Sequence, residues 1–130
     1  MREIKFRGRC SSMSAYKGEW VYGSLIQCDN GHALIVHSFD DCTSSTYHVD
    51  ADTVGQYIDM ADSQWQDIYE DDFVQDIHGN IYLIEWDNES ARFLAEGKNG
   101  LFGGTTFESC KVIGNIHDNP ELMDKLRQDG

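Results

Sequence analysis

Short runs in which apolar and polar residues alternate are the feature that most limits how this chain can fold. Alternation over about four to eight residues places apolar side chains on one face of an extended segment, which is typical of a half-buried β-strand. In segment 3–9, for example, Ile4 and Phe6 share one face. We expect strands at residues 3–9, 19–28, 32–38, 45–49, 53–58, 72–77, 80–87, 91–96 and 110–116. Strands joined by turns, without helices between them, favour a small antiparallel barrel or sandwich and exclude a parallel α/β fold.

The connections between these strands are of two kinds. Asp29-Asn30-Gly31 and His78-Gly79 contain residues that tolerate positive φ, which predicts hairpin turns. From Asp59 to Asp72 the periodicity fades, so we expect a connecting loop with one short helical turn. A glycine-rich loop is expected between Glu96 and Cys110. No helix follows its glycines to present amide groups to a phosphate, which favours a mobile hairpin loop over a nucleotide cradle.

One short helix is predicted near the end of the sequence, from Pro120 to about Arg127. Asn119 can cap its first turn, proline suits the first helical position, and Glu121 complements the positive end of the helix dipole. Its apolar face would consist of Leu122, Met123 and Leu126. Because the helix is short, we expect it to be an appendage to the sheet or a contact for a neighbouring subunit. With no internal repeat or linker, residues 1–130 are expected to form a single domain.

Charge is distributed unevenly along the chain. The formal net charge is −13, and no lysine or arginine occurs from Gly18 to Ala91, a stretch that holds 16 Asp or Glu residues. Such a surface repels nucleic-acid phosphates, so direct DNA or RNA binding is not expected. Any such contact would have to use the basic residues that precede this stretch. The alternative interpretation is that the acidity only keeps the protein soluble.

The beginning of the sequence lacks the apolar run of a signal peptide, and no window reaches the roughly 18 apolar residues of a membrane span. We therefore expect a cytoplasmic protein that does not contact membranes. The cysteine spacings match no zinc ribbon, finger or redox pair, so free and mostly buried thiols are expected. The cysteines are Cys10, Cys28, Cys42 and Cys110.

The sequence contains no phosphate-binding loop, no His-Glu-x-x-His and no glycine-flanked nucleophilic serine. We therefore predict no enzymatic activity and no cofactor. A metal site is the alternative, because Cys28 and His32 could meet across a hairpin turn. A second ligand pair, Cys42 and His48, lies on an irregular segment. These side chains and His37 are therefore expected to be ordinary surface or core groups.

Aromatic and acidic residues gather between the strands expected at 53–58 and 72–77. Trp65 lies there in a polar segment, and a tryptophan on a loop is often an interface anchor, although its ring could instead tuck the loop onto the sheet. The carboxylates do not follow the pattern of an EF-hand, and a weak cation site is a further alternative. We predict that this segment is the partner-binding surface, formed by Trp65, Asp67, Tyr69, Glu70, Asp71, Asp72 and Asp76.

Three parts of the sequence resemble one family when they are taken together and in order. The first is Arg2-Glu3-Ile4-Lys5-Phe6-Arg7 with Trp20-Val21-Tyr22-Gly23-Ser24-Leu25, the second is Thr53-Val54-Gly55-Gln56-Tyr57 with Ile68-Tyr69-Glu70-Asp71-Asp72-Phe73-Val74, and the third is Val112-Ile113-Gly114-Asn115-Ile116-His117-Asp118-Asn119-Pro120-Glu121-Leu122. These segments resemble the YopX-like family of small proteins carried by temperate phages and prophages. The matches span almost the whole chain.

The resemblance implies a mostly β fold with an SH3-like barrel and a bacterial host cell. It implies no established activity, cofactor or catalytic residue. The chain departs from the family in two places: Asp71 stands where a Tyr-Glu-Gly-Asp turn usually has glycine, and Ser63-Gln64-Trp65 replaces an Asn-Gly turn. These departures predict that the loop between Tyr57 and Tyr69 has a shape of its own.

We therefore expect a phage or prophage accessory protein that binds a host protein and interferes with it or with a defence pathway. One version is a DNA mimic, whose carboxylates occupy the groove of a nucleic-acid-binding protein. One alternative is an oligomer that sequesters a nucleotide signal as its ligand, and another is a metal-dependent hydrolase. A further alternative is a structural subunit of a homo-oligomer joined through the C-terminal helix.

Overall fold

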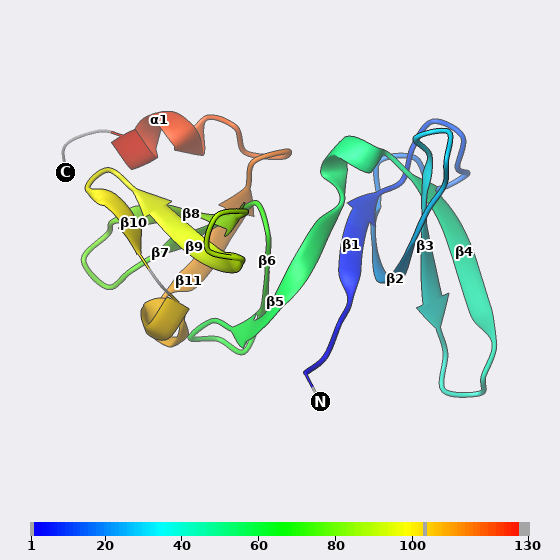
Figure 1. Cartoon of the computed structure of the whole chain (residues 1–130), viewed down its shortest axis with the longest axis horizontal. Helices are drawn as coiled ribbons and strands as arrows, with labels where there is room; N and C mark the ends of the chain where they lie inside the picture. The colour runs from blue at the N-terminus through cyan, green and yellow to red at the C-terminus, as the bar shows by residue number, and fades with distance from the viewer. Residues whose placement is uncertain (1, 103, 128–130) are drawn as a thin grey trace. The chain divides into compact units, whose positions relative to one another are not determined.

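The computed structural model describes residues 2–102 and 104–127, and Figure 1 shows the order of the elements. The chain divides into two compact units, Met1–Tyr57 and Ile58–Gly130. The N-terminal unit contains β1 (Phe6–Arg9), β2 (Trp20–Gln27), β3 (Ala33–Ser38), β4 (Ser44–Val49), the 3-10 helix η1 (Ala51–Thr53) and the beginning of β5 (Gly55–Ala61). The C-terminal unit contains the end of β5, β6 (Asp67–Tyr69), β7 (Asp72–Gln75), β8 (Ile81–Asp87), β9 (Arg92–Gly97), β10 (Gly100–Phe102), the 3-10 helix η2 (Gly104–Ser109), β11 (Lys111–Asn115) and α1 (Leu122–Arg127).

The strands of the N-terminal unit lie in the order β4-β3-β2-β1-β5, and neighbouring strands are antiparallel. The residues that follow β1 also reach β4: Cys10 faces Val49 in an isolated bridge, and the Ser11 N–H donates to the His48 carbonyl over 3.0 Å. This contact curls the sheet around a small apolar core that includes Ile35, which is fully buried. Beyond Ser11 the chain leaves β4, so the first residues of β4 lie at the edge of the sheet.

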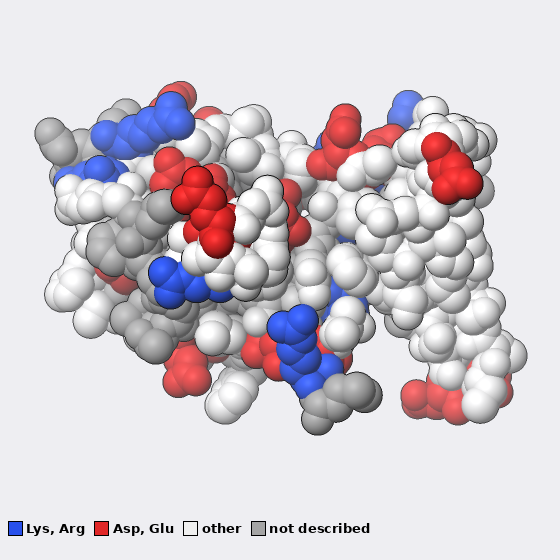
Figure 2. Space-filling model, in the orientation of Figure 1, with Lys and Arg blue, Asp and Glu red and all other residues white. Residues whose placement is uncertain are grey.

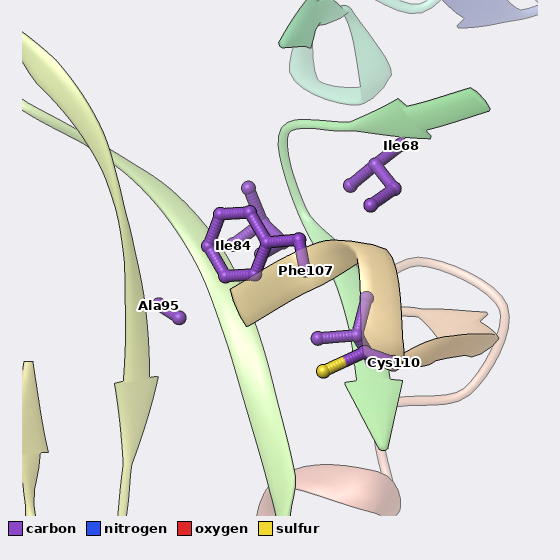
Figure 3. Packing of buried hydrophobic residues seen from close by; sticks show 6 residues of the cluster. Ile68, Ile84, Ala95, Phe107 and Cys110 are labelled. Atoms are coloured by element: carbon purple, nitrogen blue, oxygen red, sulfur yellow. The ribbon is translucent and has the colours of Figure 1, made fainter. Parts of the chain in front are cut away.

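In the C-terminal unit an antiparallel sheet has the strand order β10-β9-β8-β7-β11. Adjacent apolar residues of one strand point to opposite faces, which is why β8 buries Leu83 on one side and Ile84 on the other. Figure 3 shows Phe107 and Cys110 packed near Ile84 and Ala95 on the face of the sheet that carries Ile84. On the opposite face Leu83 packs with α1. Both faces of the sheet are therefore covered within this unit.

The structure confirms the mainly β class and the short C-terminal helix. The strands form open sheets, so the SH3-like barrel that the resemblance implied does not close within the described residues. The physical reason in the described part of the N-terminal unit is that the residues after β1 meet β4 through the isolated bridge of Cys10 and Val49, and the chain then turns away. The four cysteines are free; Cys10 and Cys110 are buried, Cys28 is half-buried and Cys42 is exposed.

Some local predictions were wrong. The strand β6 lies inside the expected connecting loop, and β10 and η2 lie in the segment expected to be a glycine-rich loop. The helix α1 begins at Leu122 instead of Pro120. The Asn119 carbonyl accepts the Leu122 N–H over 3.0 Å, whereas its side-chain Oδ1 accepts the Asn115 N–H over 3.3 Å. Gly114 makes this possible, since a Cβ at that position would lie 2.5 Å from the same oxygen.

Candidate functional site

The hairpin of β5 and β6 ends in a tight turn, residues 62–66. The Asp62 N–H donates to the Gln66 carbonyl over 2.8 Å, and the Trp65 N–H donates to the Asp62 carbonyl over 3.1 Å. Trp65 has a φ of 63°, in the left-handed region. This is the pattern of a three-residue hairpin loop, in which a type I turn is followed by a left-handed residue. The Ser63 N–H donates to the Cys110 carbonyl over 2.8 Å and ties the turn to the segment after η2.

The carboxylate of Asp62, which is only 5% exposed, holds this turn in place. Its Oδ1 accepts the N–H groups of Gln64 and Gln66 over 2.8 and 2.9 Å. Its Oδ2 accepts the N–H of Val112 in β11 over 2.9 Å. Burial acts to raise the pKa of Asp62, but these hydrogen bonds and the positive charge of Lys111 outweigh it and lower the pKa. The side chain is therefore ionised at neutral pH and fixes the turn to the sheet.

Trp65 projects from this turn with 88% of its surface exposed. The ring therefore does not tuck the turn onto the sheet. This position does not help the isolated chain to fold. The exposed indole is not removed from water, so it adds little hydrophobic stabilisation, and the left-handed backbone costs a residue with a Cβ about 1 kcal/mol. Folding alone does not explain why tryptophan occupies this position.

The turn between β7 and β8, residues 76–80, has the same design. The Asp76 N–H donates to the Asn80 carbonyl over 2.9 Å, and the Gly79 N–H donates to the Asp76 carbonyl over 3.1 Å. Asp76 Oδ1 accepts the N–H groups of His78 and Asn80, both over 2.9 Å. The left-handed position belongs to Gly79, with a φ of 86°, and glycine takes this conformation without a steric penalty. The left-handed position is therefore glycine in turn 76–80 and an exposed tryptophan in turn 62–66.

Several residues of the predicted binding surface serve the fold instead. Tyr69 and Asp72 are buried, and Asp72 Oδ2 accepts the Tyr69 N–H over 2.8 Å. Asp76 also accepts the hydroxyl of Tyr82 over 3.1 Å. Burial acts to raise the pKa of Asp76, but the hydrogen bonds from Asn80, His78 and Tyr82 outweigh it and lower the pKa.

The remaining residues of the predicted surface, Asp67, Glu70 and Asp71, are half-buried. Asp71 has a φ of 73°, and its backbone bonds to Ile84 and Ile116 over 2.8 and 3.0 Å. Both places where the chain departs from the family pattern thus contain a non-glycine residue with positive φ. The structure does not gather the predicted residues into one exposed surface, and Trp65 is the member that is fully available to a partner.

A pair of glutamates that the sequence did not mark as a site lies on β8 and β9. Glu85 is hydrogen-bonded to Glu96, and burial, this bond and the charges of Glu96 and Asp71 raise the pKa of Glu85 to about 7. His117 Nε2 lies 3.5 Å from Asp71 Oδ2. Periodicity within one strand cannot reveal this group, because only the register between strands brings the two glutamates together.

Histidines of the N-terminal unit form a hydrogen-bonded chain. Ser11 Oγ lies 2.6 Å from His48 Nδ1, and His48 Nε2 lies 2.7 Å from His32 Nδ1. Cys28 and His32 do face each other across their turn, while His37 bonds a backbone carbonyl of β2. Within residues 2–102 and 104–127, no group of three or more His, Cys, Asp or Glu side chains is placed to hold a metal ion. No helix in the described part of the chain has the length and apolar character needed to cross a membrane.

The fold and this site define a small β protein that presents an exposed tryptophan from a hydrogen-bonded hairpin turn. The YopX protein family model matches residues 5–124, so the chain belongs to the YopX family. A comparison with curated proteins found no significant match. The chain is similar to the crystal structure of protein EF1440 from Enterococcus faecalis, with a TM-score of 0.60 and 19% sequence identity over 95% of this chain and 99% of that chain. At this identity the similarity shows the fold alone.

Proposed function

We propose that this protein acts by binding a protein partner and that Trp65 is the anchor of the contact. The observation that carries the proposal is the exposed indole at a left-handed position which, in the matching turn 76–80, is occupied by glycine. A residue that weakens the fold slightly and gains nothing from burial is best explained by what it contributes when bound. Tryptophan is among the residues that contribute most to protein interfaces.

Hydrogen bonds hold the backbone of turn 62–66 in one conformation. Asp62 accepts three backbone N–H groups, so the backbone around Trp65 is fixed before a partner arrives. Little conformational entropy is then lost from this backbone on association, which favours affinity. This rigidity distinguishes the turn from a mobile loop that happens to contain an aromatic residue.

Charge indicates the kind of partner. Asp59 is exposed and Asp67 half-buried on either side of the turn, and no lysine or arginine occurs from Gly18 to Ala91. On the face drawn in Figure 2, acidic side chains lie in several separate groups. We therefore expect the partner to have an apolar pocket for the indole and a basic rim, because complementary charge speeds association and excludes other partners.

Membership of the YopX family and the acidic surface together support a role for this binding in a phage or prophage context. In that role the protein would occupy a basic-rimmed site of a host protein and interfere with it. Nucleic-acid-binding proteins, including defence proteins, have basic sites of this kind. The proposal does not require a reaction or a cofactor.

The experiment is affinity capture from a bacterial lysate with three forms of the full chain: wild type, Trp65→Gly and Ile77→Gly. Ile77 is 80% exposed in the matching turn, so its substitution controls for loss of an exposed apolar side chain. We expect a partner that wild type and Ile77→Gly retain equally and that Trp65→Gly loses. Equal retention by all three forms would contradict the role of Trp65.

A further inference from the structure

The open edge of β4 in the N-terminal unit is the second feature of the molecule that can recognise another chain. The strand lies at the end of its sheet, next to β3. The carbonyl of His48 points away from β3, because it accepts the Ser11 N–H. Backbone groups alternate in direction along a strand, so Thr46 and Ser44 also direct their N–H and C=O groups to this edge. Among the described residues no strand pairs with them there.

A groove lies against β4 and includes Thr46 of this edge in its lining. It has a volume of about 490 Å³ and lies between β4 and the segment 13–16, which follows the point where the chain leaves β4. Tyr16 and Tyr47 meet edge to face at its wall, with ring centroids 5.6 Å apart. Met13 is 69% exposed and Leu34 also lines the groove. The groove therefore combines free backbone hydrogen-bonding groups with an apolar wall.

We propose that this groove binds an extended peptide segment of a partner protein, which adds to the sheet as a strand beside β4. The peptide would continue the line of β1 beyond Ser11 and occupy the place that β1 leaves empty. Main-chain hydrogen bonds to Thr46 and Ser44 would hold it, as in other cases of strand addition. An apolar side chain of the peptide would pack against Tyr16 and Tyr47, and its neighbours in sequence would face away.

Charge decides which peptide fits. Asp40 and Asp41 lie in the turn before β4, and Asp50 and Asp52 follow it, and all four are exposed. The segments before and after β4 thus both carry exposed acidic residues, so the occupant is a peptide with basic residues on either side of its apolar centre. A second copy of β4 fits less well, because antiparallel pairing would bring the acidic turn of one copy against the acidic residues that follow β4 in the other.

The probe for the test is acetyl-Lys-Lys-Val-Thr-Val-Thr-Lys-Lys-amide, compared with the same peptide carrying Glu in place of each Lys. Amide hydrogen exchange and chemical shifts of the full chain are followed by NMR. We expect the lysine peptide to slow exchange at Ser44 and Thr46, with binding weakened by salt, and the glutamate peptide to have no effect. No protection by millimolar lysine peptide, or equal protection by both peptides, would overturn the proposal. Protection that rises with protein concentration alone would also overturn it, in favour of a second copy.

Variants separate backbone pairing from general attraction. Thr46→Pro removes one N–H at the free edge, where proline is tolerated, and should weaken the lysine peptide about tenfold, whereas Thr46→Ala should not. If Thr46→Pro does not fold, Tyr16→Ala tests the apolar wall and should also weaken binding. Unchanged binding in a folded Thr46→Pro or in Tyr16→Ala would contradict strand addition in this groove. Trp65→Gly should leave peptide binding unchanged, so this proposal and the role of Trp65 succeed or fail separately.

Discussion

Replacing Trp65 with glycine should stabilise the protein, although it removes a large aromatic side chain. The ring is 88% exposed and its loss costs little burial. Glycine adopts the left-handed conformation without strain, which adds about 1 kcal/mol to the free energy of unfolding. The greater conformational freedom of glycine in the unfolded chain cancels roughly half of this gain or more. We therefore expect Trp65→Gly to raise the free energy of unfolding by about 0 to 0.5 kcal/mol, measured by urea denaturation.

The matching turn provides the control. Gly79→Ala places a Cβ at a φ of 86°, and the nearest atom, Gln75 Nε2, would be 4.0 Å away. The same two terms with opposite sign should therefore make Gly79→Ala less stable, by about 0 to 0.5 kcal/mol. A loss of more than about 1 kcal/mol in Trp65→Gly would refute the reasoning, because it would show that the indole supports the fold. Burial in the fold, and not a partner, would then explain the tryptophan at position 65.

Other predictions concern the charges and the core of the C-terminal unit. Asp62→Ala leaves three backbone N–H groups without their acceptor and should lower the free energy of unfolding, measured by urea denaturation, by about 2 to 4 kcal/mol. A decrease below about 0.5 kcal/mol would contradict the structural role of Asp62. The pKa of Glu85 is raised to about 7 in the folded protein from an ordinary value of 4.5, so wild type should lose stability as the pH rises through this interval. Solvent screening reduces the effect to about 1 to 2 kcal/mol, and Glu85→Gln should remove this pH dependence; an unchanged slope in the variant would show that another group causes it. Ile84→Ala should lower the free energy of unfolding by about 2 to 5 kcal/mol because this side chain is fully buried, whereas Ile77→Ala at an exposed position should change it by less than about 0.5 kcal/mol. Similar losses in both variants would contradict the assignment of Ile84 to the core.

The sequence was sufficient to predict most strands, because alternation reflects burial on one face and is local. It could not reveal β6, whose three residues are too few for a periodic pattern, and β6 contains both the buried Tyr69 and the half-buried Asp67. Nor could it reveal that the Asn119 side chain bonds the backbone at Asn115, a contact that depends on the close approach to Gly114.

The candidate site was predictable only in part. An unusual tryptophan in a polar segment drew attention to Trp65, and the structure shows it exposed. Acidic residues near it looked equivalent in the sequence, but Asp72 and Asp76 accept hydrogen bonds that build turns. The key residue Asp62 was missed, since nothing local marks a carboxylate whose partner, the Val112 N–H, is 50 positions away.

The measurement that tests the central claim most directly is the affinity of a captured partner for wild type, Trp65→Gly and Ile77→Gly, by calorimetry on purified proteins. We predict that Trp65→Gly binds at least about thirtyfold more weakly while Ile77→Gly binds as wild type does. Because Trp65→Gly should be at least as stable as wild type, such a loss could not be attributed to unfolding. Equal affinities of the wild type and Trp65→Gly would contradict the claim that Trp65 anchors the partner.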